Sequence, residues 1–224
     1  MKAIVLGSTG AVGTALTKEL IAHPAITAVT LLVRRRHADP EISQSPRVTQ
    51  HIVDVLHAES YESILAGHEL AFSTFGVGEP SKISRDEFIR IDLTAVQAFA
   101  QQCKKLGIRH FSSLGAVGAN PDSSLFYLKI KGQLEQSLIS LTFPRLSLFR
   151  PSMIMTPENR YGLTQALSLR FYPYLDSLLV GRFNRYRSIK VGDLGRAMAR
   201  NALKPQTAAV EILSWAEIAE VIRG

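Results

Sequence analysis

Short apolar runs alternate along most of the chain with longer segments whose apolar residues recur every three to four positions. The short runs are typical of strands, and the longer segments are typical of amphipathic helices. The predicted strands are Ala3–Leu6, Ala28–Val33, Val48–Val53, Leu70–Thr74, Ile108–Ser112, Leu146–Phe149 and Val210–Leu213. Most of these runs are apolar throughout, as expected for strands that helices cover on both faces. The pattern therefore predicts an α/β fold, with a doubly wound, mostly parallel sheet of about seven strands.

Two predicted helices carry clear start signals. Ser84 and Glu87 have the spacing of a capping box, and apolar residues follow at helical spacing until Gly107, which can end the helix. Ser214 and Glu217 repeat the capping pattern and predict a second, shorter helix.

The segment from about residue 156 to 187 is the least regular and interleaves arginines with aromatic residues. We expect it to form a small irregular cap beside a substrate site, because ligands of open α/β sheets bind beyond the carboxyl ends of the strands. The same composition is also typical of a packed cap with solvated arginines, of a membrane-surface contact, or of a single-stranded nucleic-acid site.

Composition places the chain among folded globular proteins. Its 224 residues are 46% hydrophobic and 20% charged, which fits one domain over residues 1–224. No stretch approaches the ~18 uninterrupted apolar residues of a membrane span, and no basic and apolar leader precedes the first strand, so we expect a cytoplasmic protein. Cys103 is the only cysteine and follows the helical apolar pattern, which indicates a core residue and excludes an internal disulfide.

Several functional classes lack their signals in this sequence. The net charge of +7 is typical of nucleic-acid binding, but the basic residues are scattered and no recognition motif accompanies them. The six histidines form no metal-ligand pattern, so we expect no metal. There is no G-x-S-x-G nucleophile elbow, which argues against a hydrolase of the α/β class. We therefore expect no specific nucleic-acid partner, no transmembrane segment and no peripheral membrane contact.

A glycine-rich loop follows the first predicted strand directly and precedes a predicted helix. It reads Gly7-Ser8-Thr9-Gly10-Ala11-Val12-Gly13. The first glycine allows a sharp turn, the second lets a phosphate approach the backbone, and the third allows close packing of the helix on the sheet. The helix N-terminus would face a pyrophosphate, and the two hydroxyl side chains can add donors. The loop predicts a dinucleotide site.

The residues after the second strand bear on the choice of dinucleotide. An NAD-specific site places an acidic residue about twenty positions after the last glycine, to bind the ribose hydroxyls. Here that place holds Arg34-Arg35-Arg36, whose guanidinium groups can clamp a 2′-phosphate, so NADP is preferred to NAD. A solvated basic turn is the alternative. Further contacts to the nucleotide are expected at the ends of the third and fourth strands, from Asp54, Val55, Ser73, Thr74, Phe75 and Gly76. For Asp54 the alternative is an exposed aspartate that starts a turn.

Tyr127 and Lys131 are four positions apart in a helical segment, so their side chains share a face. A free tyrosine titrates near pH 10, and proton exchange at neutral pH requires roughly 4 kcal/mol of stabilisation of the phenolate. A neighbouring ammonium and a nicotinamide cation can supply this together. Taken alone, the Tyr-x-x-x-Lys spacing is common by chance.

With these motifs together, the chain resembles the atypical short-chain dehydrogenase/reductases, and within them the Tat-interacting-protein-like oxidoreductases. The resemblance covers essentially the whole length. It is carried by the glycine-rich loop, by the basic turn, by Phe111-Ser112-Ser113-Leu114-Gly115-Ala116 and by Tyr127-Leu128-Lys129-Ile130-Lys131-Gly132. It implies a Rossmann sheet, and it places Arg150 and Pro151 beside the nicotinamide.

The resemblance also implies roles in catalysis. Tyr127 would be the general acid in carbonyl reduction, and Lys131 would bind the nicotinamide ribose and tune the tyrosine. Ser113, or else Ser112, would hydrogen-bond the substrate oxygen; Ser113 is preferred because it lies nearer the carboxyl end of its strand. No clear counterpart exists for the catalytic asparagine that many relatives carry on the long helix.

The function implied is that of an NADP-dependent oxidoreductase acting on a small or medium carbonyl or alcohol, with a homodimer left open. An NADP-binding redox sensor or interaction protein without turnover is an alternative, because fold does not dictate function. A third alternative is an epimerase, dehydratase or nucleotide-sugar enzyme, although the short C-terminal portion counts against it.

Overall fold

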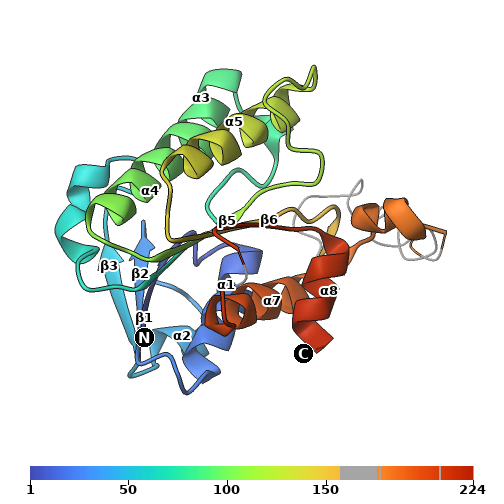
Figure 1. The fold of residues 1–224 in the computed structure, drawn as a ribbon. Helices are drawn as coiled ribbons and strands as arrows, with labels where there is room; N and C mark the ends of the chain where they lie inside the picture. Colours follow the sequence, from blue (N-terminus) through green and yellow to red (C-terminus); the bar gives the residue numbers. More distant parts are fainter. Residues whose placement is uncertain (157–175, 177, 207, 224) are drawn as a thin grey trace.

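The computed structural model describes residues 1–156, 176, 178–206 and 208–223, and its centre is a seven-stranded sheet in which every pair of neighbours is parallel. The strand order is β3-β2-β1-β4-β5-β6-β9 (Figure 1). The bounds are β1 (Lys2–Leu6), β2 (Ala28–Val33), β3 (Val48–Ile52), β4 (Leu70–Ser73), β5 (His110–Leu114), β6 (Arg145–Phe149) and β9 (Val210–Leu213). The order reverses between β1 and β4, which creates the switch point at which such sheets bind ligands. The predicted fold class is confirmed.

Helices cover both faces of the sheet (Figure 1). One layer contains α1 (Ala11–Ala22), α7 (Val191–Leu203) and α8 (Trp215–Arg223). The other contains α3 (Arg85–Ile89), the π-helix η4 (Arg90–Ala95), α4 (Val96–Lys105) and α5 (Phe126–Ser140). Shorter elements are α2 (Pro40–Ser43), the 3₁₀ turns η1 (Ala58–Ser60), η2 (Glu62–Ile64), η3 (Pro80–Lys82) and η5 (Gly181–Tyr186), and a separate parallel pair of β7 (Ile154–Met155) and β8 (Ile189–Lys190).

Alternation along the strands divides the core in two. Ala3 and Val5 of β1 pack into the α1 and α7 side, whereas Ile4 and Leu6 pack into the α4 and α5 side. On the first side, α1 and α7 are in backbone contact, because a Cβ on Gly195 would lie 2.6 Å from the amide nitrogen of Leu16. This two-sided burial explains why most strand sequences are apolar throughout.

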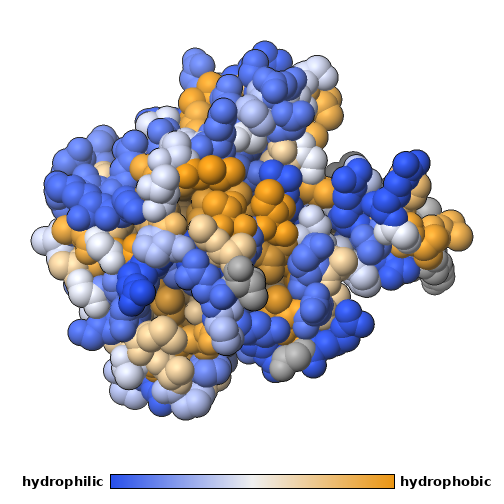
Figure 2. All heavy atoms as spheres, viewed as in Figure 1, coloured by the Kyte–Doolittle hydropathy of each residue, from blue (hydrophilic) through white to orange (hydrophobic). Residues whose placement is uncertain are grey.

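The outer strands depart from that rule. β3 is half-exposed, with the Ile52 side chain 62% accessible, and Val210 and Ile212 of β9 are also exposed. Figure 2 shows hydrophilic residues over most of the outer helices and hydrophobic residues in the centre of the view, between the two helical layers. A sheet edge has a neighbouring strand on one side only, so its side chains are less covered than those of a central strand.

The long helix begins as predicted, since the Ser84 hydroxyl accepts the Glu87 amide at 3.2 Å. It contains the π-helical segment η4, which the sequence pattern does not predict. Gly107 ends it with a φ of +80°, and the Ile108 amide donates to the Cys103 carbonyl. Ile108 therefore belongs to the helix cap, and β5 begins at His110 instead of the predicted Ile108.

Two further expectations concern the C-terminal third of the chain. The Ser214 amide donates to the Glu217 carboxylate at 2.9 Å, which is one half of the predicted capping box before α8. Of the cap expected over 156–187, residues 157–175 and 177 lie outside the described residues, so the cap and the single-domain organisation stay predictions. No helix in the described ranges is both long and apolar enough to cross a bilayer.

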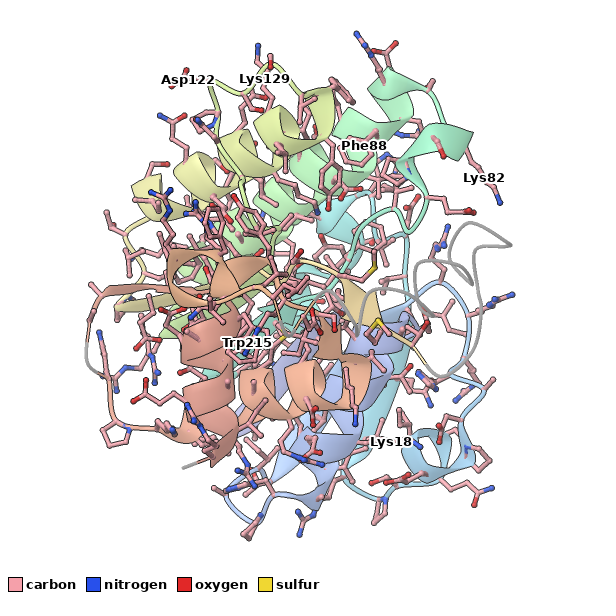
Figure 3. The ribbon with its side chains drawn as sticks, turned by 90° about the vertical axis from the view of Figure 1, so that its right-hand side faces the viewer. Lys18, Lys82, Phe88, Asp122, Lys129 and Trp215 are labelled. Carbon is pink, nitrogen blue, oxygen red and sulfur yellow. The ribbon has the colours of Figure 1, made fainter. Side chains whose placement is uncertain are left out.

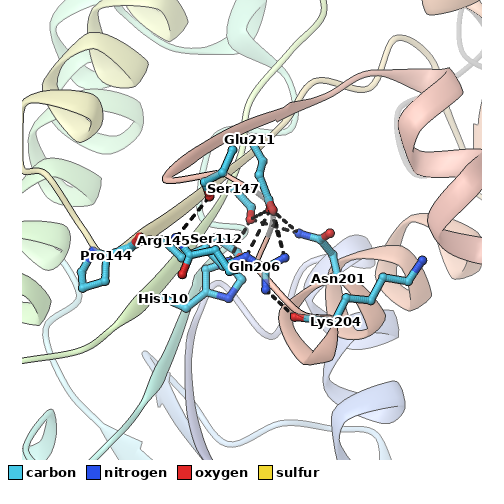
Figure 4. A network of polar contacts seen from close by, with 10 residues as sticks. His110, Ser112, Pro144, Arg145, Ser147, Asn201, Lys204, Gln206 and Glu211 are labelled. Atoms are coloured by element: carbon cyan, nitrogen blue, oxygen red, sulfur yellow. Dashed lines mark hydrogen bonds and ion pairs between the residues drawn. The ribbon is translucent and has the colours of Figure 1, made fainter.

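A buried polar network joins β5, β6, β9 and α7 on the α1 and α7 side (Figure 4). His110 Nε2 lies 2.8 Å from the Ser147 hydroxyl, which in turn donates to Glu211 at 2.8 Å. Arg145 and Asn201 also donate to the Glu211 carboxylate. Burial, together with the positive charge of Arg145, lowers the pKa of His110 to about 4.

We expect this network to make the fold sensitive to acid. An unfolded histidine takes up a proton near pH 6.5, whereas His110 in the fold resists protonation until about pH 4, so its contribution is complete above pH 6.5 and is lost as the pH falls towards 4. At 1.36 kcal/mol per pKa unit, the loss is about 3 kcal/mol. Urea unfolding of the wild type and His110→Gln across this range measures it. The variant should show a shallower pH dependence; parallel curves would contradict the assignment.

Candidate functional site

The glycine-rich loop begins where β1 ends, and its shape depends on two glycines. Gly7 has a φ of +93°, and a Cβ there would lie 2.5 Å from the Phe75 amide nitrogen. A Cβ on Gly13 would lie 2.1 Å from the Gly7 carbonyl oxygen. At Gly10 a Cβ would approach only that same oxygen, at 3.4 Å. Packing within the protein therefore explains Gly7 and Gly13, whereas Gly10 leaves room on the open side of the loop.

Donors at this loop fit an anionic group. Gly10 is the N-cap of α1 and supplies no side-chain cap, and the first turn contains no acidic residue. The Ser8 hydroxyl is fully buried and has no hydrogen-bond partner among the residues that the structure describes. A helix N-terminus with unpaired amides and a positive dipole end favours phosphate, and an unpartnered buried hydroxyl calls for a ligand oxygen. The loop thus fits a dinucleotide pyrophosphate.

Residues at the neighbouring strand ends surround this loop. Because Leu6 pairs with Leu32, the basic turn Arg34–Arg36 leaves β2 beside Ser8, and all three arginines are exposed. Ser73 is buried opposite Leu6, and the Thr74 hydroxyl donates to the Gly7 carbonyl at 3.0 Å. These segments converge at one edge of the sheet, as the sequence predicts.

Asp54 begins a turn after β3, which is the alternative that the sequence leaves open for this residue. Asp54 accepts from the Leu56 amide at 3.0 Å and lies 2.8 Å from His57, so its carboxylate forms a turn. The His57 hydrogen bond and the Leu56 amide lower the pKa of Asp54. The Val55 side chain is 2% exposed and packs in the core. Contact of Asp54 and Val55 with a nucleotide stays a prediction.

Tyr127 and Lys131 do meet on one face of α5. The Lys131 ammonium nitrogen lies 5.8 Å from the centre of the Tyr127 ring, and the same ring packs against Phe88 at a centroid distance of 5.8 Å. In Figure 3, Phe88 lies in the helical layer formed by α3 and α5. The aromatic contact orients the phenol, and the spacing of four explains its closeness to the ammonium.

A buried ion pair holds Lys131. Its ammonium donates to Asp92 Oδ1 at 2.7 Å, and the two side chains are only 8% and 1% exposed. The other Asp92 oxygen accepts the Val77 amide at 2.8 Å. Burial alone would lower the pKa of Lys131, but the charge and hydrogen bond of Asp92, together with Tyr127 and Glu135, outweigh burial and raise this pKa. The pair therefore keeps the lysine protonated and joins it to the loop that follows β4.

Asp92 is a functional candidate that none of the sequence motifs contains. It lies in η4 of the long helix, which has no clear counterpart of the catalytic asparagine of many relatives. A signal was present, because Asp92 follows Ile89 by three positions and precedes Val96 by four, which puts a carboxylate on the apolar stripe of the helix. A charged residue at such a position requires a buried partner.

The two adjacent serines face opposite sides of the sheet. Ser112 lies 3.3 Å from His110 on the network side. Phe111, two residues before Ser113, packs in the core beneath α4 and α5, so Ser113 faces the side of Lys131. Ser113 is 2% exposed, pairs with Ser73 and lies one residue before the end of β5.

Arg150 binds Glu135, a pairing that the sequence pattern does not predict. Its Nε lies 3.1 and 3.0 Å from the two oxygens of Glu135, and its terminal nitrogen makes a further short contact to the same carboxylate. A Cβ on Gly115 would lie 2.6 Å from Glu135 Oε1, so the carboxylate fills the side-chain space at Gly115. Burial raises the pKa of Glu135, and Arg150 opposes this shift. Contact of Arg150 and Pro151 with a nicotinamide stays a prediction.

Comparison with known proteins identifies the family of the chain. The sequence profile of the family described as NAD(P)H-binding matches residues 7–139, which is more than half of the chain. The chain belongs to this NAD(P)H-binding family. The match spans the glycine-rich loop, Asp92, Tyr127 and Lys131. The predicted dinucleotide-binding class is confirmed, and the choice between NAD and NADP is not decided by it.

Individual relatives define the family more closely. Protein HTATIP2 of Rattus norvegicus is 30% identical over 209 residues, covering 93% of this chain and 84% of that protein. FMP52-1 of Scheffersomyces stipitis, named as mitochondrial, is 33% identical over 183 residues, covering 78% and 77%. The structure of MoeE5 in complex with UDP-glucuronic acid and NAD has a TM-score of 0.72 at 16% identity, covering 99% and 81%. The resemblance to the atypical short-chain dehydrogenase/reductases is confirmed, and the structural neighbour confirms the fold.

The expected cytoplasmic location is wrong on this comparison. FMP52-1 and the FMP52 relatives of Eremothecium gossypii and Candida albicans are all named as mitochondrial proteins, which contradicts that expectation.

The geometry at Asp92 predicts that an asparagine cannot replace it. Two donors, the Lys131 ammonium and the Val77 amide, converge on its two oxygens. An amide offers one oxygen, so its NH₂ group would face the second donor. We expect Asp92→Asn to lower the free energy of unfolding by about 3–5 kcal/mol, as when one partner of a buried pair is removed. Denaturant unfolding measures this, with the exposed Asp122→Asn as control; equal stabilities of the two variants would contradict it.

Proposed function

We propose that the protein is an NADP-dependent oxidoreductase that transfers hydride between NADPH and a small or medium carbonyl or alcohol. The observation that carries the proposal is the pair of Tyr127 and Lys131, with the ammonium 5.8 Å from the ring. An NAD(P)H-binding protein without turnover has no evident need for a phenol beside a buried ammonium. The family membership and the fold support oxidoreductase chemistry in general.

The cofactor would lie along the sheet edge. The amides of the Gly7–Gly13 loop and the Ser8 hydroxyl would hold the pyrophosphate, and Arg34 and Arg35 would hold the 2′-phosphate. NADPH supplies the hydride, which is chemistry that the side chains cannot provide. The exposed basic turn, beside Ser8 in the strand register, supports NADP over NAD.

The protein's own groups would move the proton. Tyr127 would donate its hydroxyl proton to the carbonyl oxygen during reduction and recover it from solvent. Lys131, held protonated by Asp92, would favour the phenolate left behind. Ser113, on the same side of the sheet as Lys131, would hydrogen-bond the substrate oxygen.

A redox sensor without turnover is the second candidate. The observation in its favour is Ser113, which is 2% exposed and lies inside the strand, so a substrate oxygen has little access to its hydroxyl.

The UDP-sugar ligands of MoeE5 belong to that protein, and its likeness to this chain concerns the fold alone.

Catalysis is tested with Tyr127→Phe. NADPH oxidation is followed with a panel of aldehydes and ketones, and the variant should lose about 10²–10⁴-fold in rate because it lacks the transferable proton. NADPH binding and thermal stability should stay at the wild-type values, since the ring still packs on Phe88. Full activity in the variant would refute the mechanism. Tight NADPH binding by the wild type without turnover on any carbonyl would favour the sensor.

Cofactor preference is tested with Arg34→Asp. Replacing a charge-assisted contact by a carboxylate should cost about 1.5–3 kcal/mol for NADP, a fall of ten-fold or more in the ratio of NADP to NAD affinity. Calorimetric titration of both cofactors measures the ratio. Arg223→Asp on α8 makes the same charge change away from the basic turn and should leave the ratio at its wild-type value. An unaltered ratio in Arg34→Asp would show that the turn does not hold the phosphate.

A further inference from the structure

His37 lies directly after the three arginines of the basic turn, yet it is only 8% exposed. Its Nε2 is 3.1 Å from the Ser8 carbonyl oxygen and 3.3 Å from the Thr14 hydroxyl. Its Nδ1 accepts the Asp39 amide at 3.1 Å, and its own amide donates to Gln50 at 2.8 Å. One residue thus connects the basic turn to the glycine-rich loop, to α1 and to β3.

The partners determine how the ring is protonated. A backbone amide can only donate, so Nδ1 is an acceptor, and a carbonyl oxygen can only accept, so Nε2 carries the hydrogen. The Ser8 carbonyl also accepts the Thr14 hydroxyl at 3.1 Å. The ring therefore donates from Nε2 and accepts at Nδ1, and these two hydrogen bonds hold the basic turn at a set distance from the glycine-rich loop.

The acidic residues near the turn form ion pairs with a lysine instead of with the arginines. Lys18 of α1 binds Asp39 at 2.8 Å and Glu41 at 2.9 Å, and its hydrogen bond lowers the pKa of Asp39. Figure 3 shows Lys18 on the side of α1 that faces α2. Within the described part of the chain, the structure records no ion pair for the three arginines. Their charges are therefore available to a ligand at the end of β2.

We propose that His37 determines the preference for NADP by fixing the basic turn against the glycine-rich loop. It is a positioning residue, because its ring nitrogens are used by the protein and the arginines would make the contact to the 2′-phosphate. The inference rests on the proposed NADP site. In this inference the arginines alone do not set the selectivity for NADP. The selectivity depends on their distance from the glycine-rich loop, which the hydrogen bond between His37 Nε2 and the Ser8 carbonyl maintains.

Two substitutions separate the two ring nitrogens. His37→Gln keeps a donor near the position of Nε2, whereas His37→Asn keeps an acceptor near the position of Nδ1 and cannot reach Ser8. Binding of NADP⁺ and NAD⁺, and of the fragments 2′,5′-ADP and 5′-AMP, is measured by calorimetry. His37→Asn should lower the ratio of NADP⁺ to NAD⁺ affinity about five-fold or more, the equivalent of one lost hydrogen bond, and the fragments should show the same change. His37→Gln should stay within about two-fold of the wild type.

The controls distinguish the possible outcomes. His51→Asn on β3 should leave the ratio unchanged, and thermal unfolding reports whether each variant is folded. Should His37→Asn not fold, Gln50→Met removes the acceptor of the His37 amide and should shift the ratio in the same direction. Equal weakening of both cofactors would overturn the inference, because His37 would then only support the pyrophosphate loop. If the wild type prefers NADP⁺ and His37→Asn has the same affinity ratio, this inference alone is overturned. If the wild type itself does not prefer NADP⁺, the proposed NADP site is overturned as well.

Discussion

The buried ion pair between Lys131 and Asp92 is the interaction on which the candidate site depends. It joins α5 to the π-helical segment of the long helix, and through the Val77 amide it joins both to the loop after β4. Because the pair is almost fully buried, neither charge can turn to solvent, and the three segments are held in one arrangement. Asp92 lies in the π-helical segment itself, and π-helical segments are frequent at functional sites.

The parallel sheet explains why residues far apart in the chain meet here. Leu6 pairs with both Leu32 and Ser73, so the glycine-rich loop, the basic turn and the Thr74 loop all leave the sheet at one level. The strand order reverses between β1 and β4, so the connections that follow these two strands lie on opposite faces of the sheet. The N-terminus of α1 lies at this switch point. The hydrogen-bond donors of these loops therefore converge because of the strand order, although no single sequence motif contains them all.

Local rules account for what the sequence predicted. Apolar runs gave the strands, Ser84 gave the helix start, and the glycine spacing gave the loop, because each depends on neighbours within a few residues. Ile108 was misplaced because a hydrogen bond to Cys103 extends the helix cap into an apolar run. Asp92, Glu135 and His37 were missed because their partners lie 39, 15 and 29 residues away, at Lys131, Arg150 and Ser8. Such pairings follow from tertiary packing. The sequence shows that these residues are polar, but it does not show that they are buried or which partners they bind.

Stability is a poor explanation for the charges in this site. Burying an ammonium and a carboxylate costs several kcal/mol for each ion, and an apolar pair of similar volume is often as stable. A lysine that is to remain charged away from water nevertheless requires a carboxylate, and Asp92 raises the pKa of Lys131 against the effect of burial. The arrangement thus spends folding free energy to keep a positive charge 5.8 Å from the centre of a phenol ring. That cost is understandable if the phenol must give up a proton, which links this unfavourable burial to the proposed chemistry.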